Sequence, residues 1–219
     1  MIRMPAVLRI DPVEVDHRLH DLGWTRDELI EVALTMVNAR YSCTENDPVS
    51  AAGWMAWKEG TRRLREIGRQ HGMVINNDDQ VPWLIDESRK RRFSVANTDE
   101  GTANEFQIPQ NRTRKGNATD KAIAENEGLL FLEAEITSLA PRISAISHHP
   151  EILVSWYLCV YCTPDGIAVE LSCPTAMEGG FFLDFAERIF IAKLDGDLVT
   201  TLPDVDEPTE EFDVPVTKK

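Results

Sequence analysis

A basic run over 111–117 is the segment of this sequence best suited to bind an anion. It reads Asn-Arg-Thr-Arg-Lys-Gly-Asn and directly precedes a segment, 118–126, that we expect to be a helix. A helix N-terminus offers unpaired backbone N–H groups and partial positive charge, and Arg112, Arg114 and Lys115 would add charge-assisted contacts to phosphate oxygens. The glycine spacing is not that of a P-loop. We expect an anion site, with a solvated loop tip as the alternative.

A second group of basic side chains follows one side of a predicted helix that ends near Gly72. The helical period of about 100° per residue places them opposite the apolar face, and the tip of a predicted hairpin adds more. If these groups and the run over 111–117 converge, they form a patch that binds phosphates with salt-dependent affinity. The alternative is a solvated face, because acidic residues are interspersed. The expected phosphate or nucleic-acid site comprises Lys58, Arg62, Arg65, Arg69, Arg89, Lys90, Arg112, Arg114 and Lys115.

Aromatic residues on the same helix add a second kind of contact. Trp54 lies one turn before Lys58, where it could stack on a base or make a cation–π contact. The helix that carries Trp54 and Trp57 is also a candidate surface for a protein partner.

The Cys-x-x-Cys motif at Cys159 and Cys162, with Cys173 and the pair His148-His149 nearby, contains the ligand types of a zinc site. The motif lies in an apolar segment that we predict to be a strand, however, and positions three apart in a strand point to opposite faces. We therefore predict core cysteines and expect neither a metal nor a cofactor.

Carboxylates could support hydrolysis, and Glu170 with Asp165 or Asp184 is the candidate set. The order of Asp165 and Glu170 resembles, in outline only, the Asp and Glu-x-Lys arrangement of metal-dependent nucleases. The spacing is too short, and Ser172 stands where a lysine would be needed to activate water. We expect Glu170 to face solvent or to pair with Arg188, and we identify no catalytic residue.

Three predicted helices form an N-terminal layer over 1–72. Asp11-Pro12 combines an N-cap with proline at the first helical position, and Thr25-Arg-Asp-Glu is a capping box. Asp47-Pro48 repeats the start signal for the third helix. Gly53 and Gly60 lie on the apolar side of that helix and indicate close approach by another element.

The remaining segments predict strands and one long loop. Two short strands, 81–85 and 93–96, form a hairpin, and a polar loop follows from 97 to 117. An interior strand over 152–162 is apolar on both faces and returns through a turn to a strand over 167–173. Helix and strand remain open for 129–135 and for 181–194.

Charge is unevenly distributed along the 219 residues, although the net charge of −14 would by itself disfavour anionic partners. Residues 1–57 carry 5 basic and 9 acidic residues, 58–121 carry 13 and 10, and 122–219 carry 5 and 18. Between Asp195 and Asp213 there are 8 acids and no base. We predict one domain over 1–194, helical over 1–72 and mixed over 73–194, followed by an acidic tail over 195–219. The tail could solubilise the protein, compete with phosphate for the basic segment, or bind a partner.

These observations predict an α+β protein with an N-terminal helical layer, a central hairpin and long loop, and a C-terminal antiparallel sheet with one helix. No apolar run is long enough for a membrane span or a signal peptide, so we expect a cytoplasmic location without membrane contact. The expected function is non-catalytic binding of a phosphate-bearing ligand, nucleic acid or nucleotide, through the central basic segment and within a larger assembly. The alternatives are a metal-dependent, nuclease-like hydrolase and a protein-interaction subunit without nucleic-acid contact.

Overall fold

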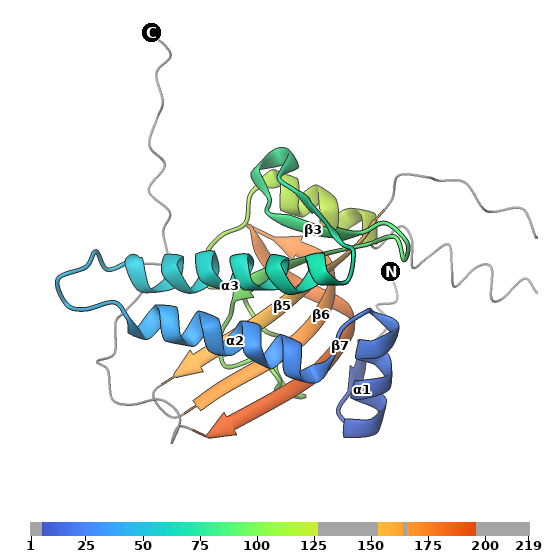
Figure 1. Ribbon diagram of the computed structural model, residues 1–219, viewed down its shortest axis with the longest axis horizontal. Helices are drawn as coiled ribbons and strands as arrows, with labels where there is room; N and C mark the ends of the chain where they lie inside the picture. The colour runs from blue at the N-terminus through green and yellow to red at the C-terminus, as the bar shows by residue number, and fades with distance from the viewer. Residues whose placement is uncertain (1–5, 127–152, 164–165, 196–219) are drawn as a thin grey trace, which may run out of the picture.

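The computed structural model describes residues 6–126, 153–163 and 166–195, which form one sheet with helices on both of its faces (Figure 1). The helices are α1 (Pro12–Asp21), α2 (Arg26–Tyr41), α3 (Ala51–Gln70), the 3-10 turn η1 (Asp78–Gln80) and a helix over 117–126. The strands are β1 (Val7–Arg9), β2 (Val74–Asn76), β3 (Trp83–Asp86), β4 (Arg91–Asn97), β5 (Val154–Thr163), β6 (Gly166–Glu178) and β7 (Phe181–Asp195). The expected α+β class is confirmed. None of the helices in these residues combines the length and apolarity needed to cross a bilayer.

The sheet has seven strands in the order β1-β7-β6-β5-β4-β3-β2. In its C-terminal part, β6 pairs antiparallel with both β5 and β7, as expected. The hairpin of β3 and β4 joins them because β4 pairs with β5 in parallel, so the hairpin and the C-terminal strands form one mixed sheet. The edge strands β1 and β2 were not predicted, because three residues are too few to show an alternating pattern.

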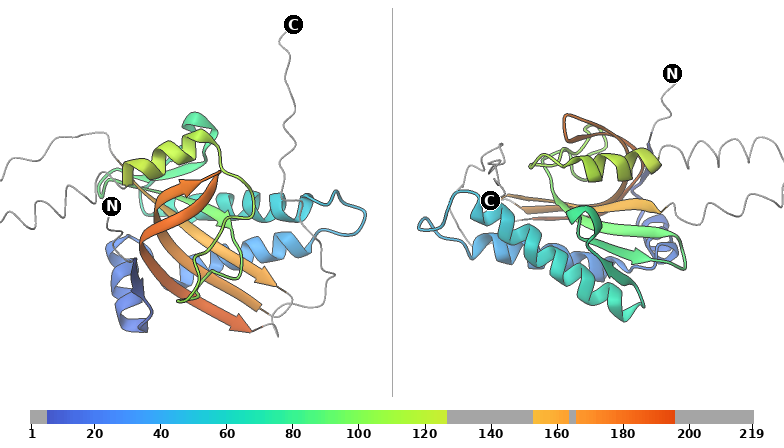
Figure 2. Two further views of the ribbon diagram at one scale, coloured as in Figure 1. Left: turned by 180° about the vertical axis from the view of Figure 1, so that it is seen from behind. Right: turned by 90° about the horizontal axis from the view of Figure 1, so that it is seen from above.

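Each face of the sheet has its own apolar core. Helices α1, α2 and α3 cover one face, and the helix over 117–126 covers part of the other (Figure 2). Strand β5 contributes to both cores, with Trp156 and Leu158 packed against the three helices and Tyr157 and Cys159 on the opposite side. The prediction of an interior strand that is apolar on both faces is confirmed.

The first two helices begin where the sequence predicted. The Asp11 carboxylate accepts hydrogen bonds from the N–H groups at the start of α1, and Thr25 and Glu28 form the capping box of α2. Helix α3 begins at Ala51, later than the Asp47-Pro48 signal indicated. The Asp47 carboxylate accepts instead from the backbone N–H and the hydroxyl of Thr44, so it caps a turn and not the helix.

Small residues on α3 allow the close approach that the sequence indicated. A Cβ on Gly60 would overlap the side chain of Met36 on α2, and a Cβ on Gly68 would overlap Leu84 on β3. The carbonyl of Gly53 accepts a hydrogen bond of 2.8 Å from the Nδ2 group of Asn97, which ties the start of α3 to the end of β4.

The segment over 181–194, left open between helix and strand, is strand β7. Phe182 and Phe185 both pack in the second core, a spacing of three that is typical of helices. Register shifts opposite them, between Cys173 and Met177 on β6, show that the pairing there is irregular. A β-bulge changes which residues share a face, so here it gives a strand the spacing of a helix. The open segment 129–135 and the acidic tail beyond Asp195 lie outside the described residues.

Candidate functional site

A large groove lies between the first half of α3 and the loop that leads into the helix over 117–126. Its volume is about 750 Å³, within the range of small-molecule sites. We call it the α3–loop groove. It is lined by Ser50, Gly53, Trp54, Trp57, Asp79, Gln80, Val81, Pro82, Ser94, Asn97, Thr113, Arg114, Lys115, Gly116, Ala118, Thr119 and Tyr157.

The loop wall of the groove is held by the turn between β6 and β7. The Nε–H of Arg114 donates to the carbonyl of Gly179 (2.8 Å), and the backbone N–H of Lys115 donates to the carbonyl of Gly180 (2.9 Å). The side-chain amide of Asn111 donates to the same Gly180 carbonyl (2.9 Å). Gly180 has a φ of +90°, and a Cβ there would lie 3.0 Å from the carbonyl oxygen of Lys115. The position of the basic loop is therefore set by hydrogen bonds to the backbone carbonyls of Gly179 and Gly180, none of which uses the Arg114 Nη groups.

The helix over 117–126 begins at this wall with an open N-terminus. The carbonyl of Gly116 accepts from the N–H groups of Thr119 (3.0 Å) and Asp120 (3.2 Å), so Gly116 is the N-cap and has no side chain to offer. In the described part of the chain, the N–H groups of Asn117 and Ala118 have no hydrogen-bond partner. A Cβ built on Gly116 meets nothing within 4 Å. Two backbone donors and the positive end of a helix dipole thus remain uncapped beside Arg114 and Lys115.

The floor of the groove contains Tyr157 of β5, which is buried. The Nζ of Lys115 lies 5.9 Å from the centroid of its ring. The Tyr157 hydroxyl is close to the Thr119 side chain but makes no hydrogen bond of good geometry within the described residues. Burial raises the pKa of Tyr157 far above its usual value, so the hydroxyl stays protonated. A buried O–H without a good partner at the floor of a groove is a position where a ligand or a water would be favourable.

The opposite wall is aromatic and comes from α3. Trp54 is 55% exposed, a high value for a large apolar side chain. The Nζ of Lys58 lies 5.8 Å from the centroid of the Trp54 ring, in the cation–π range that the sequence indicated. Trp57, one helical turn after Trp54, is half-buried and packs against the core between the sheet and helices α1 to α3. Trp54 is therefore the more exposed of the two tryptophans on this wall.

A strained turn closes the third side. Asp79 and Gln80 have φ values of +54° and +61°, a left-handed conformation that is uncommon without glycine. Asp79 is the one acidic residue among the described residues that line the groove. Consecutive left-handed residues of this kind cost roughly 1–3 kcal/mol each and cluster at functional sites.

The groove brings together only part of the expected basic patch. Arg114 and Lys115 line it, and Lys58 lies next to it at Trp54. Arg62 pairs with the acidic side chains of its own helix. Arg65 donates to the carbonyls of Asn76 and Trp83 and to the side chain of Asn77, and burial lowers its pKa. Arg69 is exposed in the last turn of α3.

The hairpin tip lies far from the basic loop. Arg89 donates to the Asp86 carboxylate (2.8 Å) and contacts Gly23, between α1 and α2. Lys90 precedes the first residue of β4, whereas the backbone N–H of Arg112 donates to the carbonyl of Asn97, the last residue of β4. Strand residues rise by about 3.3 Å, so seven residues separate these backbones by roughly 20 Å.

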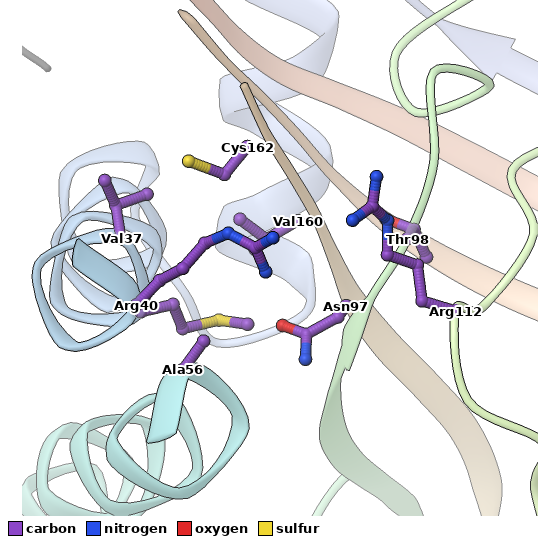
Figure 3. A pocket seen from close by; sticks show the side chains of 9 residues that line it. Val37, Arg40, Ala56, Asn97, Thr98, Arg112, Val160 and Cys162 are labelled. Carbon is purple, nitrogen blue, oxygen red and sulfur yellow. The ribbon is translucent and has the colours of Figure 1, made fainter. Parts of the chain in front are cut away.

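Arg112 belongs to a different, very small hollow between α2, α3 and β5. Figure 3 shows Arg40 reaching from α2 into this hollow, with Asn97, Cys162 and Arg112 around it. Its volume of about 10 Å³ is roughly the size of one water molecule. The thiol of Cys162 lies 3.4 Å from the Tyr41 hydroxyl. We therefore do not assign a ligand to this hollow.

Cys159 and Cys162 point to opposite faces of β5, as expected: Cys159 packs in the second core and Cys162 against the first. All four cysteines are free thiols. Among the described residues, no group of three His, Cys, Asp or Glu side chains is placed to hold a metal ion.

Glu170 pairs with Arg188, one of the two arrangements that we expected. Its Oε2 lies 2.7 Å from the Arg188 Nη2, and the Ser172 hydroxyl and the Ala103 N–H also donate to the carboxylate. Asp184 is opposite Ala176, six residues along β6 from Glu170 and thus roughly 20 Å away. Asp165 lies outside the described residues. The structure does not bring Glu170 and Asp184 together.

Several groove residues were not identified from the sequence. Tyr157 resembled any core aromatic of an interior strand, and the segment containing Asp79 showed only the composition of a turn. From the sequence, the α3 wall of the groove was indicated by Trp54 and Trp57 and by the position of Trp54 one turn before Lys58. No family model matches the chain, and no curated protein and no solved structure is significantly similar to it.

Proposed function

We propose that the protein is a non-catalytic binding protein that holds a phosphate-bearing ligand in the α3–loop groove. One observation carries the proposal: an uncapped helix N-terminus flanked by Arg114 and Lys115 faces an exposed Trp54 across a single groove. The helix N-terminus with its basic side chains can bind a phosphate, and the Trp54 ring can stack on the face of a base. A nucleotide has both groups within one small molecule.

The surroundings of the groove favour a nucleotide over a long nucleic acid. A polymer needs a continuous basic track, but the other expected basic residues are paired with acids, bonded to carbonyls or remote. The net charge of −14 adds a long-range repulsion that a polyanion would experience more strongly than a nucleotide. Nucleic acid remains the alternative ligand, and the test below includes it.

A binding role is preferred to a hydrolytic one because of Glu170. Its carboxylate is fully buried and accepts hydrogen bonds from three groups, so it has little capacity left for a metal or a water. The free thiols support the proposed cytoplasmic location, where cysteines stay reduced.

The proposed place within a larger assembly has one supporting observation. Phe106 is 92% exposed, on a loop fixed by hydrogen bonds from Arg188 to the carbonyls of Gly101, Asn104 and Gln107. A rigidly presented aromatic side chain is typical of contacts to a protein partner. This observation also supports the second candidate function, a protein-interaction subunit.

The test is calorimetric binding of the four ribonucleoside monophosphates and of a single-stranded oligonucleotide at fixed low salt. We expect micromolar to millimolar binding of at least one nucleotide. Replacing Arg114 and Lys115 by Ala should weaken it by about tenfold or more, since each removes a charge-assisted contact. Arg112→Ala is the matched control, because Arg112 is in the same loop but outside the groove.

The results separate the alternatives. If no nucleotide binds to the folded protein at millimolar concentration, the nucleotide proposal is wrong. Tight binding of the oligonucleotide alone would favour the nucleic-acid alternative. If Arg112→Ala lowers the nucleotide affinity as much as the double variant does, the binding site does not lie in the groove.

A further inference from the structure

We infer that the ligand presents a terminal phosphate monoester, which binds at the N-terminus of the helix over 117–126. Gly116, the N-cap residue, has no side chain and so leaves the N–H groups of this helix end available to the phosphate. The inference rests on the proposed function and specifies its ligand. It predicts weaker binding of ligands whose only phosphates are internal diesters.

The donors at the helix start favour a monoester. Arg114, Lys115, Gly116 and Ala118 line the groove where the helix begins, and the N–H groups of Asn117 and Ala118 are uncapped there. A phosphate monoester offers three oxygens and a charge of about −2 at neutral pH, whereas a diester offers two free oxygens and one charge. The two positive charges of Arg114 and Lys115 therefore match the charge of a monoester and exceed that of a diester.

Gly116 is the residue that keeps the site open. Ser, Thr, Asp and Asn are the preferred N-cap residues, because their side chains accept from the same N–H groups that remain unpartnered here. Space is not the reason for glycine, since a Cβ at Gly116 meets nothing within 4 Å. Conformation is not the reason either, because Gly116 is not among the residues with positive φ. A bare cap makes the donors available to a ligand at some expense in helix stability.

Tyr157 is the second, independent sign of a ligand. Its buried hydroxyl lacks a good hydrogen-bond partner within the described residues, and the side chain forms the floor between Lys115 and Thr119. The loop above it is already fixed by Gly179 and Gly180, so binding needs little ordering of the backbone. The charged groups that face the phosphate are Arg114 and Lys115 from the loop and Asp79 from the opposite turn, while Lys58 lies beyond Trp54.

The orientation of the ligand follows from this placement. With the phosphate at the helix start, the rest of the molecule extends across the groove toward Trp54. A nucleoside monophosphate fits this arrangement, and so does the phosphorylated end of a nucleic acid strand, which has the same terminal group.

The experiment compares Gly116→Asp with Gly116→Asn by calorimetry and thermal unfolding. Both side chains cap the helix and have nearly the same shape, so both variants should unfold at the same or a higher temperature than the parent protein. Only Asp adds a negative charge at the position of the phosphate. We expect Gly116→Asp to bind the tightest nucleoside monophosphate about tenfold or more weakly than Gly116→Asn does.

Three further probes define the ligand class. The parent protein should bind the monophosphate about tenfold more tightly than the cyclic diester of the same nucleoside, and the unphosphorylated nucleoside least. A short oligonucleotide with and without a terminal phosphate then distinguishes the two sources of the monoester. Preference only for the phosphorylated strand would identify a strand end; equal or better binding of the free nucleotide would identify a nucleotide.

Equal affinity of Gly116→Asp and Gly116→Asn for the monophosphate would overturn the inference, as would equal binding of monoester and cyclic diester by the parent protein. The proposed function would survive either result if the Arg114 and Lys115 double variant still lost binding. Absence of nucleotide binding in the parent protein would instead remove the proposed function itself.

Discussion

Burial decides the role of Glu170. In the sequence it is a carboxylate on a strand near other acids, and chemistry at that position was one alternative. In the structure both Glu170 and Arg188 are buried, and they pair with each other at 2.7 Å. The same Arg188 donates to the carbonyls of Gly101, Asn104 and Gln107, so the pair anchors the long loop after β4 to the sheet.

We predict that Glu170→Gln destabilises the protein by about 3–5 kcal/mol, because it leaves the Arg188 charge buried without its partner. Urea unfolding followed by tryptophan fluorescence measures the change. Glu66→Gln is the control: Glu66 pairs with Arg62 and Arg63 at the exposed surface of α3, so its removal should change stability by about 1 kcal/mol or less. Similar effects of the two substitutions would show that the buried pair does not anchor the loop.

Helix α3 contributes both to the core and to the α3–loop groove. Its apolar side packs on α2 and the sheet through small residues, while Trp54 and Lys58 on its outer side form a wall of the groove. The position of that wall depends on how closely α3 approaches its neighbours, and Gly60 sets this distance at Met36.

Gly60→Ala tests the packing of this element. Alanine has a better helix propensity by about 1 kcal/mol, but its Cβ would overlap the Met36 side chain, and overpacking costs roughly 1–3 kcal/mol. We expect net destabilisation in thermal and urea unfolding. In a Met36→Ala background the same substitution should become neutral or stabilising, because the overlap is gone. Additive effects of the two substitutions would argue against the close contact.

Charge is organised at the scale of the whole molecule. The central segment is slightly basic and the total is −14, but the fold distributes the basic side chains over separate places: the groove, the outer side of α3, the hairpin tip and the small hollow at Arg112. A single groove of local positive charge is therefore expected in place of one extended basic surface.

The salt dependence of oligonucleotide binding measures how many basic residues act together. For single strands the slope of log K against log salt is about −0.7 for each phosphate neutralised. Contacts limited to Lys58, Arg114 and Lys115 predict a slope of about −2. Joint action of all nine expected residues predicts roughly −6, and a slope near that value would contradict the division that the fold indicates.

Features that depend on neighbours within a few residues could be predicted along the chain. The caps at Asp11 and Thr25, the amphipathic face of α3 and the doubly apolar strand β5 are all of this kind, and all are confirmed. The basic run over 111–117 before a helix was also visible. Hydrogen bonds and side-chain periodicity inside one element carry this information, so it can be read along the chain.

Which of these features meet depends on contacts between distant parts of the chain. Parallel pairing of β4 with β5 and the bulged pairing of β6 with β7 bring Trp54, Gly116 and Tyr157 to one groove, while Arg112 and Lys90 go to opposite ends of a strand. Glu170, a candidate catalytic residue in the sequence, is buried in the structure, where its pair with Arg188 anchors the loop after β4. Contacts between distant residues depend on strand order and register, which local propensity does not encode, and a groove is made entirely of such contacts.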